Sequence, residues 1–232
     1  MFEYENVLVV AAHPDDEVLG CGGTIARLSQ AGVNVDVLLI ADGEKSRLSN
    51  NQLGEMNSLI LGRQYAAEQA RSVLGSRSVE CLDFPDNSLD TVGMLDIVKT
   101  IEDRVEKFRP SLVFTHHPSD VNIDHRIVHE AVTVACRQIP GFSVKELLFF
   151  EVMSSTEWRP IGKGTNFEPN YYVDISSTIE VKKRALLAYD SEMRDFPHPR
   201  SLRACEALAT WRGATVGVIA AEAFVLGRRV IN

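Results

Sequence analysis

The chain places a histidine and three acids directly after an apolar run, a combination that suits metal chemistry. His13, Asp15, Asp16 and Glu17 follow the apolar residues 7–12. Acids this close together repel one another, and a bound cation is an economical way to relieve the repulsion. Imidazole and carboxylate ligands together are typical of sites for zinc or a similar divalent ion.

A second polar cluster, at residues 115–129, has the sequence THHPSDVNIDHRIVH. A catalytic zinc ion typically takes three protein ligands and leaves one position for water. His13 and Asp16 from the first cluster, with His125 from the second, would complete that set. The spacing alone leaves an alternative open, in which Asp16 and Glu17 only cap a helix and His13 is an exposed loop residue.

A nucleotide-binding loop is another interpretation of the first cluster, because Gly20, Gly22 and Gly23 follow a strand and open a helix. The dinucleotide fingerprint has its first glycine directly after the strand, so that backbone amides approach a pyrophosphate. In this chain the glycines come later, behind acids whose charge opposes a phosphate. Close packing of the helix on the sheet is therefore the favoured role of these glycines.

The elements that must position both clusters follow from the alternation of short β-branched runs with longer amphipathic segments. Strands are predicted at residues 6–12, 34–40, 79–83, 111–116 and 145–152, and helices at 17–31, 58–75, 91–108 and 125–138. A later helix is predicted from Ser177, with a capping box to Glu180, as far as Met193. The near-continuous apolar strands predict an α/β fold with a mainly parallel sheet and helices on both faces.

Both clusters follow predicted strands, so they belong at the carboxyl ends of a parallel sheet, where open α/β sheets bind ligands. After residue 153 the pattern loosens into a loop, a short YYVDI strand and a DFPHPRS turn. The apolar segment AEAFVL near the end of the sequence suits an edge strand or an interface between subunits. No repeat or linker divides the sequence, so residues 1–232 are expected to form a single domain.

The composition predicts a globular protein, because 45% of the 232 residues are hydrophobic and can fill a sizeable core. The formal net charge of −8 and the lack of a basic cluster argue against nucleic acid and anionic membranes as partners. No apolar stretch approaches the roughly 18 residues of a membrane span and no targeting signal is recognisable, so we expect a cytoplasmic protein. The four cysteines form no CxxC pair, which predicts neither disulfides nor a thiolate metal site.

The motif AHPDDE at residues 12–17, with DVNIDH at residues 120–125, resembles the PIG-L/LmbE family of zinc-dependent N-deacetylases. The similarity extends to the strand order, the overall length and the helix from Arg63 to Gly75. The resemblance implies a Rossmann-like three-layer sandwich. It also implies Zn²⁺ as the cofactor, although another divalent metal is compatible, and the N-acetyl group of an amino sugar as the substrate.

By this resemblance, His13, Asp16 and His125 are the metal ligands and Asp15 is the general base. A general base of this kind takes a proton from water. Once protonated, Asp15 could deliver that proton to the departing sugar nitrogen. One acid is then fixed as a ligand while its neighbour cycles between protonation states.

The second motif departs from the family pattern at one position. Many members have a histidine two residues before the aspartate of this motif, where this chain has Asn122. An asparagine can donate a hydrogen bond but cannot titrate, so Asn122 is expected to stabilise the oxyanion without acting as an acid. Asp124, which orients that histidine in the family, is expected to hold a metal ligand instead.

Other histidines are candidates to replace the missing imidazole. Our hypothesis is that the turn around His198 folds over the pocket and that His198 supplies the proton or the oxyanion contact. His116 and His117 end the fourth predicted strand, where a buried structural role is equally compatible. His129 lies one helical turn after His125, so an HxxxH zinc pair is an alternative, although packing is its favoured role.

Substrate-binding candidates are fewer. Arg47 and Arg63 could reach substrate hydroxyls, a phosphate or a carboxylate from the same rim, although Arg47 could equally be a solvated charge. Trp158 could form a lid or a sugar-stacking wall, and an incidental surface aromatic explains it equally well.

The sequence thus predicts a zinc hydrolase that removes the acetyl group from a small-molecule N-acetylated amino sugar or sugar conjugate. One alternative is a metal-dependent amidase for another small-molecule conjugate. A catalytically inactive sugar-binding protein is a second alternative, although the presence of Asp15 argues against it. A homo-oligomer is compatible with the sequence but is not specified by it.

Overall fold

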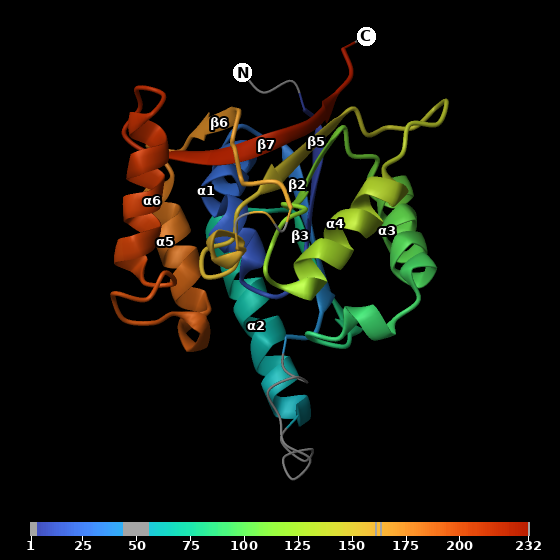
Figure 1. Ribbon diagram of the computed structural model, residues 1–232, viewed down its shortest axis with the longest axis horizontal. Coiled ribbons are helices and arrows are strands. Elements are labelled where there is room, and N and C mark those ends of the chain that lie inside the picture. The colour runs from blue at the N-terminus through green and yellow to red at the C-terminus, as the bar shows by residue number, and fades with distance from the viewer. Residues whose placement is uncertain (1–3, 44–55, 161, 163, 232) are drawn as a thin grey trace.

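The computed structural model describes residues 4–43, 56–160, 162 and 164–231, and within them seven strands form one sheet in the order β3-β2-β1-β4-β5-β7-β6 (Figure 1). The strands are, in chain order, β1 (Asn6–Ala11), β2 (Asn34–Ala41), β3 (Ser78–Phe84), β4 (Leu112–His116), β5 (Glu146–Phe150), β6 (Tyr171–Asp174) and β7 (Ala221–Arg229). The first five strands are parallel, and β7 runs antiparallel to its neighbours β5 and β6. This confirms the predicted α/β fold with a mainly parallel sheet.

Helices cover both faces of the sheet and make it a three-layer sandwich. The helices are α1 (Asp16–Gln30), α2 (Met56–Leu74), α3 (Met94–Phe108), α4 (Ile123–Ala135), α5 (Ile179–Ala188) and α6 (Leu202–Ala214), with short 3-10 turns η3 (Leu89–Thr91), η4 (Thr156–Trp158) and η5 (Asp190–Glu192). In Figure 1, α1, α2, α5 and α6 lie on one side of the sheet and α3 and α4 on the other. No helix of the described residues is long and apolar enough to cross a bilayer.

The central strand β1 is apolar throughout because its two faces enter two different cores. Val7, Val9 and Ala11 pack in the core under α1, α2, α5 and α6. Leu8 and Val10 pack in the core under α3 and α4. Successive side chains of a strand point to opposite faces, so a strand covered on both sides has no polar position.

The glycines of the first motif let α1 approach the sheet. A Cβ atom at Gly20 would lie 2.4 Å from the Phe150 ring, and one at Gly23 would lie 2.7 Å from Ile175. A real Cβ atom does not fit at such distances. These positions have the packing role that the sequence favoured over phosphate binding.

The prediction of one helix from Ser177 to Met193 is wrong at both ends. Thr178, not Ser177, is the N-cap residue of α5, and the helix ends at Ala188. The chain turns there because Tyr189 leaves helical geometry and donates its hydroxyl to Glu17 Oε1 at 2.7 Å. The turn η5 follows and contains Glu192, an acid of the candidate site.

The segment AEAFVL is an internal strand and not the edge strand that the sequence suggested. It belongs to β7, which lies between β5 and β6, and β6 is the edge. Side chains of a strand project to the faces of the sheet, and in this segment Ala221, Ala223 and Phe224 are buried, with Phe224 in the core under α1, α2, α5 and α6. The segment therefore gives no support for an interface between subunits.

The sheet brings the two polar clusters together at its topological switch point. β1 and β4 are neighbouring parallel strands. The chain leaves β1 for α1 on one face and leaves β4 for α4 on the other, so the two connections diverge. A crevice forms at the carboxyl ends of strands where connections diverge in this way.

Candidate metal centre

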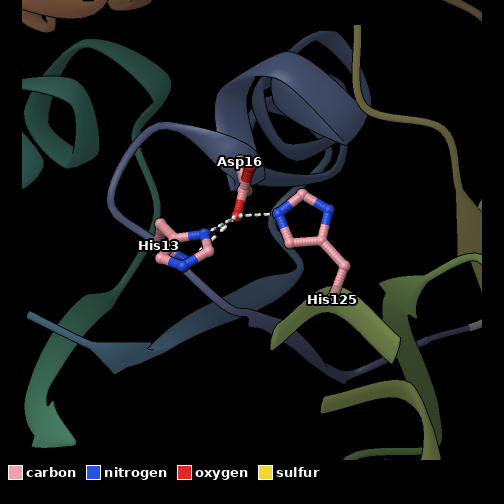
Figure 2. A group of neighbouring side chains, drawn as sticks. All are labelled: His13, Asp16 and His125. Atoms are coloured by element: carbon pink, nitrogen blue, oxygen red, sulfur yellow. Dashed lines mark hydrogen bonds and ion pairs between the residues drawn. The ribbon is translucent and has the colours of Figure 1, made fainter. Parts of the chain in front are cut away.

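Three side chains from the two clusters converge at this crevice, as Figure 2 shows. His13 and Asp16 come from the start of α1 and the loop before it, and His125 comes from the first turn of α4. Asp16 Oδ2 lies 3.2 Å from His13 Nδ1 and 3.2 Å from His125 Nε2. One nitrogen or oxygen atom from each residue lies within 4.8 Å of the other two, which is close enough to share a metal ion. The structure therefore brings all three predicted ligands together.

Each imidazole of this triangle is backed by a carboxylate on its other nitrogen. His13 Nε2 lies 3.1 Å from Asp124 Oδ2 and 3.2 Å from Asp86 Oδ1. His125 Nδ1 lies 3.2 Å from Asp120 Oδ2. A carboxylate behind a histidine fixes the ring orientation and makes the facing nitrogen a better ligand, as is usual for metal-bound histidines. The placement of Asp124 agrees with its expected role of holding a ligand.

Asp120 is a buried acid of the second motif whose role the sequence analysis did not identify. Its carboxylate accepts hydrogen bonds from the hydroxyls of Ser155 and Thr156, the latter at 2.7 Å. Burial acts to raise the pKa of Asp120, but its contacts with His125 and these hydroxyls outweigh burial and lower that pKa to about 2. Asp120 thus stays ionised opposite His125. Its spacing of five residues before His125 was the signal available in the sequence.

The three groups of the triangle shift one another's pKa values. Burial acts to raise the pKa of Asp16, but the charge and hydrogen bond of His125 and the hydrogen bond of His13 hold that pKa well below its usual value. Burial lowers the pKa of each imidazole, yet the neighbouring carboxylates raise it to about 10 for His13 and about 9 for His125. Two positive rings thus offset part of the negative charge of the surrounding acids, a role that a divalent cation could take.

Two buried atoms of this group support a fit to a metal ion. Among the described residues, Asp16 Oδ1 has no hydrogen-bond partner, and His125 Nε2 has none apart from its 3.2 Å contact with Asp16 Oδ2. A buried polar atom without a partner costs about 1–3 kcal/mol, so its presence in a folded protein calls for a reason. Two imidazole nitrogens and a carboxylate oxygen are donors that zinc accepts, and they leave room in its coordination for water.

The alternative that Asp16 and Glu17 only cap a helix while His13 is exposed is not supported, because Asp16 contacts both His13 and His125 and the His13 side chain is only 13% exposed. Asp15 is the N-cap residue of α1, but its side chain makes no capping hydrogen bond. Asp15 instead has a φ of 124°, and Arg200 Nη1 donates to its Oδ2 at 2.7 Å. Burial raises the pKa of Asp15 to about 7, although the charge of Arg200 acts in the opposite direction.

A pocket of about 60 Å³ opens beside Asp15. Besides His13 and Asp15, the residues that line it include Arg63, Asn87, Asn122, Glu192 and Arg200. Arg63 donates to Glu192, so this predicted substrate-binding residue does lie at the pocket. Arg200 and Glu192 are pocket residues that the sequence analysis did not find, because they lie far along the chain in a turn without a recognisable motif. Arg47 lies outside the described residues.

Asn122 has a structural task in addition to its place in the pocket wall. Its Oδ1 accepts the N–H of Asp124 at 2.8 Å and caps α4, and its Nδ2 donates to Asn87 Oδ1 at 3.1 Å. An amide NH₂ has two donors. Asn122 therefore has one N–H beyond the bond to Asn87.

The structure brings Arg200, and not His198, to Asp15. The imidazole of His198 faces the edge of Trp158 at 6.2 Å between ring centroids, and its Nδ1 accepts the backbone N–H of Arg200 at 3.0 Å. His198 is absent from the residues that line the pocket beside Asp15. Trp158 is 53% exposed and is likewise absent there.

The remaining histidines are occupied by packing and backbone hydrogen bonds. His116 Nε2 accepts the N–H of Ala12 at 2.8 Å, and its ring stacks on His125 at 4.0 Å. His117 Nδ1 accepts the N–H of Ser119 at 3.2 Å. His129 Nδ1 lies 2.9 Å from the carbonyl oxygen of His116, which supports the packing role over an HxxxH metal pair.

Comparison with known proteins agrees with this geometry. The PIG-L family model, described as GlcNAc-PI de-N-acetylase, matches residues 8–136. A diacetylchitobiose deacetylase of Thermococcus kodakarensis is 30% identical over 197 residues, which cover 82% of this chain and 71% of that protein. A probable N-acetyl-alpha-D-glucosaminyl L-malate deacetylase 2 of Bacillus cereus is 28% identical over 189 residues, covering 81% of this chain and 83% of the relative.

Solved structures show the same architecture. The conserved protein TT1542 of Thermus thermophilus has a TM-score of 0.76 at 28% identity, over 97% of this chain and 96% of that chain. GalB, the 4-carboxy-2-hydroxymuconate hydratase of Pseudomonas putida KT2440, has a TM-score of 0.80 at 21% identity, over 98% of each chain. At that identity the likeness to GalB concerns the fold and not the reaction.

Fold and site together define a Rossmann-like α/β protein with a candidate metal centre at the carboxyl ends of β1 and β4. The family match and the relatives narrow this class further. The chain belongs to the PIG-L family.

Proposed function

We propose that this protein is a zinc-dependent hydrolase that removes the acetyl group from an N-acetylated amino sugar or sugar conjugate. The observation that carries the proposal is the convergence of His13, Asp16 and His125 beside Asp15 at one pocket. The names of relatives, among them the diacetylchitobiose deacetylase, support an acetylated sugar as the substrate. We propose that residues 1–232 form one deacetylase domain, and its cytoplasmic location and oligomeric state stay predictions.

In this proposal His13, Asp16 and His125 hold the metal ion. Two imidazoles and one carboxylate are the number and type of ligands found in catalytic zinc sites. When bound, zinc supplies a Lewis acid that polarises the acetamide carbonyl and makes a water molecule more acidic. Asp124 and Asp120 keep the two imidazoles facing the ion, and each of them stays outside the set of ligands.

Asp15 is the proposed proton carrier. It takes a proton from the attacking water and returns it to the departing sugar nitrogen, because an amide anion is a very poor leaving group. Burial raises the pKa of Asp15, which favours uptake of a proton by this carboxylate during the reaction. Asp16, which imidazoles surround, stays ionised as a ligand, so the two neighbouring acids have different tasks.

Two polar side chains of the pocket are proposed to contact the substrate. The N–H of Asn122 that does not face Asn87 is a candidate donor to the oxyanion, and such a donor is typically worth ~3 kcal/mol. Arg63, held by Glu192, is a candidate for binding substrate hydroxyls. In this proposal His198 supports the turn that carries Arg200 by accepting its backbone N–H, and it does not carry the proton.

The experiment measures acetate release and metal content together. Purified protein is expected to contain one zinc ion per chain and to release acetate from at least one sugar of a panel that includes diacetylchitobiose and N-acetylglucosaminyl malate. A chelator should abolish the release, and added zinc should restore it. Asp15→Asn should lower turnover roughly 10²–10⁴-fold while metal content stays normal, because the amide cannot accept the proton. Asp103→Asn, at an exposed position of α3, is the matched control.

Each alternative has its own outcome. Stoichiometric metal without acetate release from any sugar of the panel would favour an amidase for another conjugate. Protein without metal and without turnover would favour a sugar-binding protein. Full acetate release by Asp15→Asn would contradict the proposed role of Asp15 as proton carrier, although the protein would still be a deacetylase.

A further inference from the structure

Arg200 lies in the pocket wall, outside residues 8–136 that the family model matches. Its Nη1 donates to Asp15 Oδ2 at 2.7 Å and to Glu192 Oε2 at 3.3 Å, and its Nε donates to Ser154 Oγ at 2.7 Å. A guanidinium group is planar and presents its donors in a fixed fork. Partners on three separate segments therefore determine where this group lies.

The backbone that carries this guanidinium group is also held. The N–H of Arg200 donates to His198 Nδ1 at 3.0 Å, and its carbonyl oxygen accepts the N–H of Arg194 at 3.3 Å. Directly after it, Ser201 caps α6 by accepting the N–H of Ala204 at 3.1 Å. The turn between η5 and α6 is thus closed by its own hydrogen bonds and ends in a capped helix.

Asp15 needs external support, because a φ of 124° is unfavourable for any residue with a side chain. Glu17 Oε2 accepts the N–H of Asp15 at 3.1 Å. The carbonyl oxygen of Asp15 accepts the N–H groups of Val18 and Leu19 at 3.0 and 2.9 Å. These contacts hold the main chain of Asp15, whereas Arg200 holds its carboxylate.

Charges alternate through the pocket wall and keep Arg200 in place. Glu192 lies between Arg200 and Arg63 and pairs with both. Glu192 is buried, so turning Arg200 away from the pocket would leave a buried carboxylate with one cation fewer. The arrangement therefore favours one position of the guanidinium group, in contact with Asp15.

We propose that Arg200 is a positioning residue that holds the Asp15 carboxylate beside the candidate metal centre in the orientation needed for proton transfer. The inference rests on the proposed function, in which Asp15 carries the proton. The turn after η5, which carries Arg200, would then take part in the reaction by orienting Asp15. The cation that acts on the base thus comes from the C-terminal part of the fold and not from the second motif, where this chain has Asn122.

The first test compares kinetics with metal content. Arg200→Ala should lower kcat roughly 10- to 100-fold, the range observed when an outer partner of a metal site is removed, with KM and zinc content near the wild-type values. Guanidinium chloride at millimolar concentration should restore part of kcat in this variant and leave the wild type unchanged. Arg200→Lys keeps the positive charge but lacks the planar fork of donors. Its kcat should therefore lie between that of Arg200→Ala and that of the wild type. Arg203→Ala is the matched control, because Arg203 is exposed and stacks on Phe196.

The second test does not depend on activity. A crystal structure of zinc-loaded Arg200→Ala should show the Asp15 carboxylate displaced from its wild-type position, with His13, Asp16 and His125 in place. An unchanged kcat, or an Asp15 carboxylate that stays in place, would overturn the proposal. If the wild type releases no acetate from any sugar, the proposed function fails separately, and the position of Asp15 still decides the role of Arg200.

Discussion

Asp15 and Asp16 are neighbours in the chain, yet their surroundings give them opposite protonation behaviour. Two imidazoles close to Asp16 favour its ionised form, and its pKa is lowered. Asp15 lies among buried acids with Arg200 as its cation, and burial raises its pKa to about 7. At the residue scale, the difference between the proposed ligand Asp16 and the proposed proton carrier Asp15 therefore comes from which groups each carboxylate contacts.

His129 gives a pH-dependent prediction at the same scale. Burial is the main cause that lowers its pKa below 6.5, so the folded protein favours the neutral ring, which packs on Phe149 and bonds the His116 carbonyl. Below pH 6.5 the unfolded chain binds the proton more readily than the folded protein does. The contribution of His129 to stability is therefore present above pH 6.5 and is lost as the pH falls below it.

The measurement is the free energy of unfolding in urea at pH 8 and pH 5.5, with a chelator present. His129→Gln keeps a donor for the His116 carbonyl but does not titrate. We expect the loss of stability between the two pH values to be smaller in this variant than in the wild type. Equal losses would show that His129 does not contribute to acid sensitivity.

At the element scale, α1 is the part that presents the first motif, and a break divides it. Cys21 has φ −146° and ψ 23°, so helical geometry is interrupted after the first turn. The short first part carries Asp16 and Glu17 at its positive end, where acids are favourable. Close contact with β5 then fixes how far this end projects into the crevice.

Gly20→Ala should separate α1 from the sheet. The new methyl group would overlap the Phe150 ring, and overpacking of this kind typically costs ~1–3 kcal/mol. The free energy of unfolding in urea should fall by about that amount. Gly62→Ala is the matched control, because Gly62 lies in α2 with open space at its Cβ position, and alanine should stabilise that helix by up to ~1 kcal/mol. A neutral Gly20→Ala would contradict the packing role of this glycine.

At the scale of the whole molecule, the last third of the chain completes a site that the first half begins. Ser155 and Thr156 hold Asp120, and Glu192 and Arg200 form the wall beside Asp15. Helix α5 and strand β7 also brace α1 at its break. The site therefore depends on the docking of α5, α6 and β7 as well as on the motifs.

The bracing contact is a buried ion pair. Lys182 of α5 donates to the Leu19 carbonyl at 2.8 Å and to Glu222 at 2.6 Å. Glu222 of β7 in turn accepts the N–H groups of Gly23 and Thr24 at 2.9 and 2.7 Å. Lys182 thus binds a carbonyl oxygen at the C-terminal end of the first part of α1, and Glu222 caps N–H groups at the N-terminal end of the second part.

Lys182→Met should destabilise the protein by roughly 3–5 kcal/mol, because it leaves the buried Glu222 charge without its cation. The double variant Lys182→Met/Glu222→Gln removes both charges and should lose less stability than Lys182→Met alone. Urea unfolding of both variants measures the difference. If the double variant is the less stable of the two, the charge of Glu222 is not what makes the single change costly.

The candidate metal ligands could be predicted from the sequence because they lie in short motifs after apolar strands. The rule that parallel strands end at one rim placed His13, Asp16 and His125 together, and the family resemblance favoured them as ligands over a helix cap. Arg200 could not be found in this way, because nothing near it in the sequence marks it as different from other arginines. Imidazole chemistry favoured His198, two residues away, but the turn directs Arg200 to Asp15 and leaves His198 bonded to the Arg200 backbone.

The sequence by itself determined the βαβ alternation, the mainly parallel sheet and the metal-binding motifs, since apolar periodicity and residue type are local properties. Tertiary structure alone decided that β7 is internal, that α5 ends at Ala188 and that Arg200 meets Asp15. These outcomes depend on contacts between segments far apart in the chain. Their energies come from burial and charge pairing that exist only when the chain is folded.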